Sequence, residues 1–465
     1  MRRTKIICTI GPATSSFEML KALYEAGMNV VRLNMSHGDH ETHLKVIKAI
    51  KTLNQEIEFP IPILVDTQGP EIRTGHLDSD LQLNEGDSIS VSVIADTSET
   101  RSIHIDYQDL IESVNVGDRI TVDNGLINLE VQSKEKFKMQ CKIIDGGLLK
   151  SKRHVNLPGI RVNLPALTSK DQHDIQFAAE HEVDFIALSF VRRAEDIDEL
   201  RELLGSRGSK IKIIAKIEDQ EALINIDAII KNADAIMVAR GDLGVEVPIA
   251  QLPNLQRKIV RLCHESGKRV IVATHLLESM IENPIPTRAE ATDVANAVYE
   301  EVDAIMLSGE TTVGKYPIKC IEYLDLIAKE SEKVRGLQFS SRLQKNVDKQ
   351  HLAASAVELA ESLQAKGIVV ITRRGIMAQF VTNCRPFQVN IFAFTNDNRT
   401  RRQLQLNRSV VPYLTHFSSD PEKTLSQALT RLKENNQMVT GDKVVVISDV
   451  IAATGIDTIQ IRRIE

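Results

Sequence analysis

Residues 211–246 read IKIIAKIEDQEALINIDAIIKNADAIMVARGDLGVE, and the pattern of this stretch decides the fold. Two short apolar runs, IKIIAKI and AIMVA, predict strands, and the amphipathic residues between them predict one helix. A strand, a helix and a strand in this order predict a parallel pair with a right-handed crossover. Charged residues close both strands, Lys216 and Glu218 the first, Arg240 and Asp242 the second.

These strand ends predict a ligand site, because ligands of parallel α/β folds bind at the carboxyl ends of the strands. Carboxylates such as Glu218 and Asp242 suit a hard cation like Mg²⁺, which completes its shell with water and substrate phosphate. The GDLG turn at residues 241–244 adds backbone N–H groups, which suit an anion. The alternative is a solvated salt bridge at the strand ends.

Composition limits the function classes. A chain of 465 residues exceeds one ordinary core, so two or three domains are expected. A net charge of -6 without a basic run predicts no nucleic-acid partner. No tract approaches the roughly 20 apolar residues of a membrane span. A strand is predicted within about five residues of the first residue, so no signal peptide is expected. The five cysteines form no CxxC pair, which predicts reduced thiols in a cytoplasmic protein rather than a zinc site.

Three predicted strands near the N-terminus carry polar residues at their carboxyl ends. They read KIICTI, NVVRLNMSHG and PIPILVDTQGPEIRTG. Arg32, inside the second strand, is costly to bury without a partner, and either a ligand phosphate or carboxylate or a structural carboxylate could pair with it. Asp66 and Thr67 end the third strand and add oxygen ligands at the same edge.

Residues 70–168 alternate polar and apolar side chains with period two, which predicts an all-β module inserted between the third strand and its helix. Asn124 and Gly125 predict a hairpin turn within it. Its two junctions, GPEIRTG and NLPALTSKD, must lie side by side. Such a module beside the ligand end of the strands is a candidate lid, and a decorative insert is the alternative.

Strand and helix patterns then alternate again, through VDFIALSFV, RVIVATHLLES and VDAIMLSGETT. Eight such units over roughly 240 residues predict a (β/α)₈ TIM barrel, whereas a doubly wound open sheet would be favoured by an early GxGxxG turn, which is missing. A polar stretch near residues 339–350 predicts a boundary. Beyond it, a helix at about 352–365 and the strands GIVVIT, VNIFAFT and DKVVVIS predict a small open-sheet α/β domain. The expected domains are a barrel at residues 1–69 and 170–342, a lid at 70–169 and a C-terminal α/β regulatory domain at 343–465.

Seven motifs together resemble those of pyruvate kinase, and the resemblance covers essentially the whole chain. They are CTIGPAT, RLNMSHG, DTQGPEIRTG, KIED, MVARGDLGVE, ATHLLESMIENPIPTRAEATDVANAV and IMLSGETTVGKYP. The resemblance implies transfer of phosphoryl from phosphoenolpyruvate to ADP, dependence on Mg²⁺ (or Mn²⁺) and K⁺, allosteric control and a cytoplasmic homotetramer. Two other readings are a different barrel enzyme acting on phosphoenolpyruvate or pyruvate, and a catalytically inactive binding protein.

The resemblance also implies a role for each matching position. The implied catalytic residues are Lys216, Arg32, Thr274 and Ser308, and the implied substrate-binding residues are Arg32, Lys216, Gly241, Asp242 and Thr274. The implied metal ligands are Glu218 and Asp242 for Mg²⁺ and Asn34, Ser36, Asp66 and Thr67 for K⁺. The implied nucleotide-binding residues are Arg73, Lys170 and His37. Phosphoryl transfer needs positioning and charge neutralisation rather than a covalent nucleophile, which agrees with this set.

Two positions near the third strand bear on cation use. Glu71 matches the acidic residue of K⁺-dependent members, so K⁺ activation is expected. Gln68 stands where many members have lysine, which removes one cation near the nucleotide and is expected to weaken ADP binding.

The expected effector loop departs from the family pattern. Arg374 and Met377 occupy its two hydroxyl positions, and the loop AATGIDT at residues 452–458 lacks the usual Gly-Ser/Thr-Thr-Asn run. These departures argue against the family's fructose 1,6-bisphosphate mode. The hypothesis that follows is that Thr372, Arg373 and Arg374 bind a different phosphorylated effector, or none.

Overall fold

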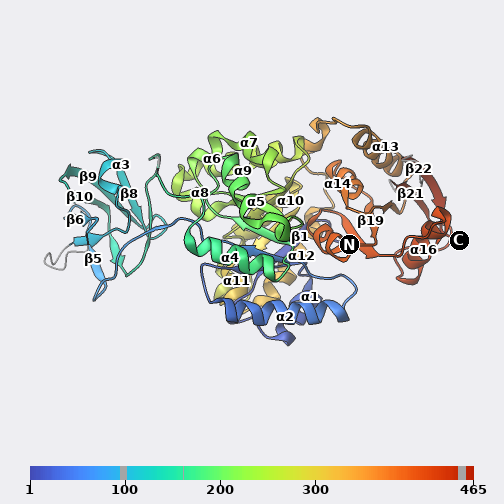
Figure 1. Ribbon diagram of the computed structural model, residues 1–465, viewed down its shortest axis with the longest axis horizontal. Helices are drawn as coiled ribbons and strands as arrows, with labels where there is room; N and C mark the ends of the chain where they lie inside the picture. Colours follow the sequence, from blue (N-terminus) through green and yellow to red (C-terminus); the bar gives the residue numbers. More distant parts are fainter. Residues whose placement is uncertain (95–101, 161, 449–456) are drawn as a thin grey trace.

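The computed structural model describes residues 1–94, 102–160, 162–448 and 457–465, and a closed barrel of parallel strands lies at its centre (Figure 1). Around the barrel the strand order is β1-β17-β16-β15-β14-β13-β3-β2. Their bounds are β1 (Lys5–Thr9), β2 (Val30–Asn34), β3 (Ile63–Asp66), β13 (Phe185–Leu188), β14 (Lys212–Ile217), β15 (Ala235–Ala239), β16 (Arg269–Ala273) and β17 (Ala304–Leu307). The predicted TIM barrel is therefore confirmed.

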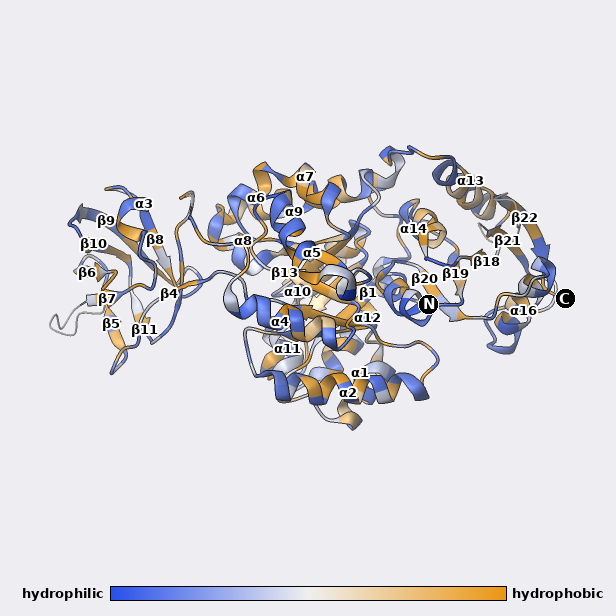
Figure 2. Ribbon diagram, viewed as in Figure 1, coloured by the Kyte–Doolittle hydropathy of each residue, from blue (hydrophilic) through white to orange (hydrophobic). Residues whose placement is uncertain are grey.

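Helices cover the outside of the barrel because each presents one apolar stripe to the strands. Figure 2 shows hydrophobic and hydrophilic stripes side by side along α2, and the buried stripe includes Val46, Ile50 and Leu53. The longer covering helices are α1 (Phe17–Ala26), α2 (His40–Glu56), α4 (Ser169–Glu180), α5 (Ala194–Gly208), α9 (Leu252–Glu265), α10 (Arg288–Tyr299) and α12 (Pro317–Ser331). Inside the barrel, Ile7, Leu64 and Met306 belong to a separate, fully buried cluster.

Two local predictions for the opening stretch are wrong. The single helix is two, α6 (Gln220–Ile224) and α7 (Ile226–Asn232), which meet at Asn225. The Asn225 side chain donates to the carbonyl of Arg192 on a neighbouring segment at 2.9 Å, a tertiary contact that a helical pattern does not reveal. The GDLG segment is not a turn but lies in a short helix, α8 (Arg240–Glu246).

The inserted module is built on a seven-stranded sheet of order β4-β12-β8-β9-β10-β6-β7 and a two-stranded sheet of β11 and β5. The strands are β4 (Ile72–Arg73), β5 (Leu81–Leu83), β6 (Ser88–Ser92), β7 (Ser102–His104), β8 (Arg119–Val122), β9 (Ile127–Lys134), β10 (Lys138–Asp145), β11 (Gly147–Leu149) and β12 (His154–Asn156), with one short helix, α3 (Leu110–Ser113). Asn124 (φ 55°) and Gly125 (φ 93°) turn β8 into β9, as predicted. The junctions do lie side by side, because the Gly69 N–H donates to Asp171 at 3.0 Å and β4 pairs with β12.

The C-terminal unit is a five-stranded sheet of order β20-β19-β18-β21-β22, in which only β22 runs antiparallel to its neighbour. Its strands are β18 (Gly367–Ile371), β19 (Asn390–Thr395), β20 (Val410–Leu414), β21 (Lys443–Ser448) and β22 (Thr458–Arg463). Its helices are α13 (Asp348–Ser362), α14 (Ile376–Asn383), α15 (Asn398–Gln403) and α16 (Pro421–Glu434). The predicted strands are present, the predicted helix begins and ends earlier than expected, and β20 and β22 were missed.

The inserted module and the C-terminal unit lie at opposite ends of the barrel (Figure 1). Ion pairs join the amino-terminal end of the barrel to the C-terminal unit. Arg385 contacts Asp303 through two nitrogens at 2.8 and 2.6 Å in a fully buried pair, and the partly exposed Arg402 contacts Asp184 at 2.9 Å. Burial raises the pKa of Asp303, but Arg385 and Arg269 outweigh it, so the net pKa is lowered. The carboxyl ends of the strands are thereby left to face the inserted module.

All five cysteines are free thiols, and burial raises the pKa of each. Among the residues that the structure describes, no helix combines the length and the apolar character needed to cross a membrane.

Candidate functional site

A buried cluster of charges lies at the carboxyl end of β14. The Lys216 ammonium is 3.1 Å from Asp66 Oδ1 and 2.9 Å from Glu218 Oε1, and only 11% of its side chain is exposed. It also donates to the hydroxyl of Ser189 at 2.7 Å. Asp66 is the last residue of β3 and Ser189 follows β13, so closure of the barrel brings the ends of β3 and β13 to the lysine of β14.

Arg32 joins this cluster from β2. Its Nε donates to Asp66 Oδ2 at 2.7 Å and its Nη1 donates to Thr9 Oγ1 at 2.8 Å. Of the two partners that the sequence left open for this buried arginine, the structure shows the structural carboxylate. Arg32 and Lys216 therefore stand on either side of one fully buried aspartate.

The electrostatics of the cluster follow from its burial. Burial lowers the pKa of Lys216, but Asp66 and Glu218 outweigh that effect and the net pKa is raised. Asp66 is likewise held ionised, because Arg32 and Lys216 lower its pKa more than burial raises it. Lys216 is paired with both Glu218 and Asp66, so its single positive charge compensates the Glu218 carboxylate only in part. Burial and the neighbouring Asp242 then raise the pKa of Glu218 to about 7.

Four sequence-predicted residues gather at the adjacent ends of β2 and β3. Asn34 pairs in register with Asp66, and its Oδ1 accepts the Ser36 N–H at 3.2 Å. The Thr67 hydroxyl donates to the Ala187 carbonyl at 3.3 Å. These neutral oxygens, with one carboxylate close by, are a donor set suited to a hard cation of low charge.

A second group lies at the start of α8. The Gly241 N–H donates to the hydroxyl of Thr274 at 2.8 Å, and that hydroxyl donates in turn to the Ala273 carbonyl at 2.7 Å. Thr274 has φ 66°, a left-handed conformation that β-branched residues rarely adopt. Backbone strain of this kind clusters at functional sites. Asp242 lies in the first turn of α8, close enough to Glu218 to raise the pKa of that residue.

Ser308 follows β17, and a residue that sequence reasoning missed positions it. Glu310, 2% exposed, accepts the Ser308 N–H at 2.8 Å and the Leu277 N–H at 3.1 Å. It thus ties together the loops after β16 and β17. Ser189 was also missed, although a polar residue at the end of an apolar strand, in VDFIALSFV, was the available signal.

The predicted nucleotide residues lie around the junctions of the inserted module. Arg73 is 2.5 Å from Glu71 Oε2 and also donates to the Lys152 carbonyl at 2.9 Å. Lys170, at the start of α4, contacts Asp174 at 2.7 Å and the Met35 carbonyl at 2.5 Å. His37 is exposed in the loop after β2. Among the described residues, no hydrogen bond or ion pair joins Arg73, Lys170 or His37 directly to Lys216.

The first junction of the inserted module requires a glycine at position 69. Its φ is 77°, and a Cβ there would lie 2.7 Å from a ring carbon of Phe190 and 2.8 Å from Cβ of Ser189. A side chain would therefore displace Ser189, which holds Lys216, and Phe190, whose N–H donates to Glu218 at 2.6 Å.

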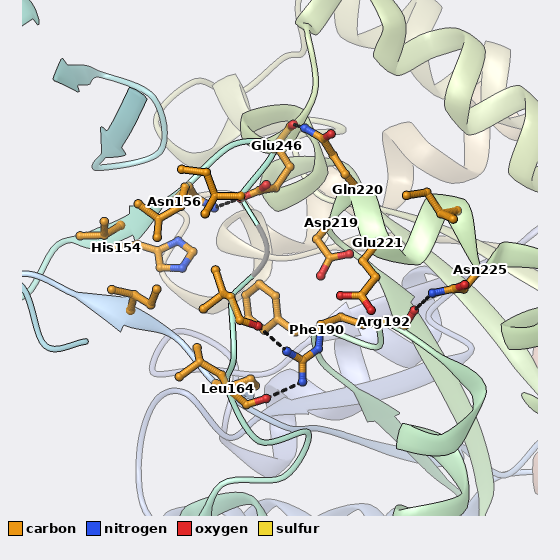
Figure 3. Close-up of a pocket in the computed structure, with 18 residues that line it drawn as sticks. His154, Asn156, Leu164, Phe190, Arg192, Asp219, Gln220, Glu221, Asn225 and Glu246 are labelled. Carbon is orange, nitrogen blue, oxygen red and sulfur yellow. Dashed lines mark hydrogen bonds between the residues drawn. The ribbon is translucent and has the colours of Figure 1, made fainter. Parts of the chain in front are cut away.

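A cavity of about 480 Å³ opens beside the cluster, between the inserted module and helices α6 and α8 (Figure 3). Phe190 lines it, and the N–H of the same residue donates to Glu218. Across it, Arg192 donates to the carbonyls of Val162 and Leu164 at 3.0 and 2.6 Å, and Asn156 donates to Glu246 at 2.9 Å. The cavity therefore lies between the second junction of the inserted module and the barrel.

Two carboxylates, Glu218 and Asp242, are the predicted ligands of a divalent ion. In the described part of the chain no group of three or more His, Cys, Asp or Glu side chains could hold a metal ion by itself. That donor set fits Mg²⁺, which commonly binds through one or two carboxylates and takes its other ligands from water and substrate phosphate.

In the C-terminal unit, the predicted effector residues lie between β18 and α14. Thr372 is buried, and its hydroxyl has no hydrogen-bond partner among the described residues. Arg373 and Arg374 are exposed, and Arg373 lies over the ring of Phe417 at 5.9 Å. Met377 is fully buried in the core of the C-terminal unit. Of the loop at residues 452–458, residues 452–456 lie outside the described residues.

Comparison with known proteins agrees with this architecture. The family model for the pyruvate kinase barrel domain matches residues 1–321, and the model for the pyruvate kinase alpha/beta domain matches residues 350–462. The chain is 43% identical over 451 residues to pyruvate kinase isozyme G, chloroplastic, of Nicotiana tabacum, which covers 96% of this chain and 80% of that protein. It is 40% identical over 457 residues to pyruvate kinase of Staphylococcus aureus strain MRSA252, which covers 97% of this chain and 78% of that protein. The chain therefore belongs to the pyruvate kinase family.

Proposed function

We propose that the chain transfers the phosphoryl group of phosphoenolpyruvate to ADP, which gives pyruvate and ATP. The observation that carries the proposal is the buried cluster in which Lys216 and Arg32 flank Asp66 at the carboxyl end of the barrel. Phosphoryl transfer depends on positioning and on neutralising charge, and two preorganised cations in a site shielded from water supply both. The family match supports this reaction over the other two readings of the sequence.

In this proposal each residue acts where its strand places it. Lys216 neutralises negative charge on the transferring phosphoryl group and on the enolate that remains, and Arg32 clamps the phosphoryl group. The N–H groups of Gly241 and Asp242, with the Thr274 hydroxyl, bind the substrate carboxylate at the start of α8. Thr274 and Ser308 lie at the ends of β16 and β17, where they can relay a proton to the enolate through water.

We also propose the cation sites. Glu218 and Asp242 would hold Mg²⁺ or Mn²⁺, and this ion would supply charge neutralisation at the substrate phosphate. Asn34, Ser36, Asp66 and Thr67 would hold K⁺, with Glu71 nearby. Lys216 compensates the charge of the Glu218 carboxylate only in part, and the pKa of Glu218 is raised. A cation bound beside Glu218 would lower that pKa and favour the ionised carboxylate.

The inserted module acts as a lid in this account. Arg73 and Lys170 lie at its two junctions, and His37 lies in the loop after β2, so closure would bring them toward the nucleotide. The ion pair of Arg73 with Glu71 and that of Lys170 with Asp174 keep both cations oriented before binding. The domain boundaries at residues 69/70, 169/170 and 342/343 belong to the same proposal.

Three further properties belong to the proposal. Thr372, Arg373 and Arg374, at the start of α14, would bind a phosphorylated effector other than fructose 1,6-bisphosphate, or none. The family resemblance implies a homotetramer that works in the cytoplasm. The names of the relatives include both plastid and bacterial proteins. Gel filtration at assay concentration tests the tetramer.

Phosphorus NMR tests the reaction itself. With phosphoenolpyruvate, ADP, Mg²⁺ and K⁺ present, the substrate phosphorus signal should decrease as the γ-phosphate signal of ATP increases. Release of inorganic phosphate without ATP would indicate a different barrel enzyme, and unchanged spectra would indicate a binding protein.

A further inference from the structure

The loop at residues 189–192, which follows β13, holds two groups of the charge cluster. The Ser189 hydroxyl accepts a hydrogen bond from the Lys216 ammonium at 2.7 Å, and the Phe190 N–H donates to Glu218 at 2.6 Å. Phe190 has φ 52°, a left-handed conformation that a bulky residue adopts only where its surroundings impose it. The loop is therefore part of the fixed framework of the cluster.

The same loop ends at an arginine that binds the inserted module. The Arg192 guanidinium donates to the carbonyls of Val162 and Leu164, in the second junction of the module, at 3.0 and 2.6 Å (Figure 3). The side chains of Val162 and Leu164 pack against the core of the module. Between them, the Asn163 N–H donates to the hydroxyl of Tyr107 at 3.1 Å. The segment that Arg192 binds is therefore joined firmly to the module.

The backbone of Arg192 is held by the barrel. Its N–H donates to Asp196 in the first turn of α5 at 2.8 Å, and its carbonyl accepts from the Asn225 side chain, where α6 meets α7, at 2.9 Å. A guanidinium presents its donors in a rigid fork, so one side chain can satisfy two carbonyls at once. Arg192 therefore fastens the module to the same loop that orients the groups around Lys216.

The first junction of the module meets this loop as well. A Cβ on Gly69 would lie 2.7 Å from a ring carbon of Phe190 and 2.8 Å from Cβ of Ser189, so this junction packs directly on the start of the loop. The second junction is bonded to the end of the loop through Arg192. The two junctions of the module thus converge on one short segment of the barrel.

We propose that Arg192 is a positioning residue for phosphoryl transfer, which fixes the second junction of the inserted module to the loop that orients Lys216 and Glu218. The module would then close over the nucleotide about this point. The proposal rests on the proposed function and on the role of the module as a lid. Arg192 acts through the segment that it binds and not on the substrates, so its loss should impair the use of ADP more than the binding of phosphoenolpyruvate.

Steady-state kinetics and amide hydrogen exchange on the full chain test the proposal with Arg192→Met. Loss of both hydrogen bonds should speed hydrogen exchange in residues 162–168 but leave it unchanged in residues 185–190, which the barrel holds. The KM for ADP should rise about tenfold or more, because hydrogen bonds from a charged group are lost. The Kd of phosphoenolpyruvate, measured by titration calorimetry with Mg²⁺ and K⁺, should be retained, because the charge cluster stays in place.

Arg193→Met is the matched control, because this neighbouring arginine pairs with Glu221 on α6 at 3.8 Å, and both readouts should stay unchanged in it. Arg192→Lys, which can still donate to one carbonyl, should recover part of the loss. Unchanged exchange in residues 162–168 of Arg192→Met would overturn the proposal, and so would equal effects in Arg193→Met or an equal loss of phosphoenolpyruvate affinity. A wild-type chain that forms no ATP would refute the proposed function instead, and the exchange measurement would still decide whether Arg192 holds the module.

Discussion

Replacement of Lys216 by methionine should lower kcat for phosphoryl transfer by about 10²- to 10³-fold. Methionine has a similar length and no charge, so it fills the same space among the strand ends. The variant therefore removes the ammonium that contacts Asp66, Glu218 and Ser189 within 3.1 Å and little else.

The magnitude follows from the distances. At about 3 Å and an effective dielectric constant of about 20, each ion contact of Lys216 amounts to roughly 5 kcal/mol before desolvation. Only the part of the substrate charge that develops in the transition state contributes to the rate. We therefore expect the variant to lose about 3–4 kcal/mol of transition-state stabilisation, which corresponds to the expected decrease in kcat.

The assay is pyruvate formation at saturating phosphoenolpyruvate and ADP, with the melting temperature measured in parallel. Asp66 keeps Arg32 as a partner and Glu218 can take up a proton, so the variant should remain folded. Lys45→Met is the matched control, because Lys45 makes only an exposed pair with Glu41 on α2. A folded Lys216→Met protein with kcat within about tenfold of wild type would refute this role for the ammonium.

Three further predictions concern cations and pH. Glu71→Lys should largely abolish activation by K⁺, whereas Glu135→Lys, an exposed control in the same module, should leave it intact; unchanged K⁺ dependence in Glu71→Lys would count against the proposed site. Burial raises the pKa of Glu246 to about 7, above its usual 4.5. The contribution of Glu246 to the free energy of unfolding is therefore greatest below pH 4.5 and is lost as pH rises through 7. The melting temperature of Glu246→Gln relative to wild type should therefore increase from pH 5 to pH 8, and a constant difference would contradict this. Burial holds the pKa of His264 well below 6.5, so stability is lost as pH falls below 6.5, and His264→Leu should gain most over wild type near pH 5. An equal gain at pH 8 would mean that packing, and not protonation, sets the effect.

The barrel could be predicted from sequence because a parallel strand covered on both faces is a short apolar run. All eight runs are fully or almost fully buried, and the polar residues after them mark the ligand end. This pattern does not identify β22, because its residues, TIQIRR, are all half-buried or exposed and resemble a loop as much as an edge strand. It also failed for β20, where Pro412 interrupts the pattern of a strand at the sheet edge.

Only some residues of the site could be predicted from the sequence, for a different reason. Lys216, Glu218 and Asp242 stand out because charge at the end of an apolar run is unusual, but Ser189 and Glu310 are ordinary residue types whose roles depend on which strands become neighbours. The partner of the Arg32 side chain could not be predicted for the same reason, since Asp66 belongs to another strand.

The rate of pyruvate formation from phosphoenolpyruvate and ADP by the wild-type chain, with Mg²⁺ and with or without K⁺, tests the central claim most directly. Pyruvate and ATP should form rapidly and in equal amounts, and their formation should depend on both cations. Binding of phosphoenolpyruvate without any pyruvate at any K⁺ concentration would contradict it, and Gln68 would then be the first position to restore to lysine.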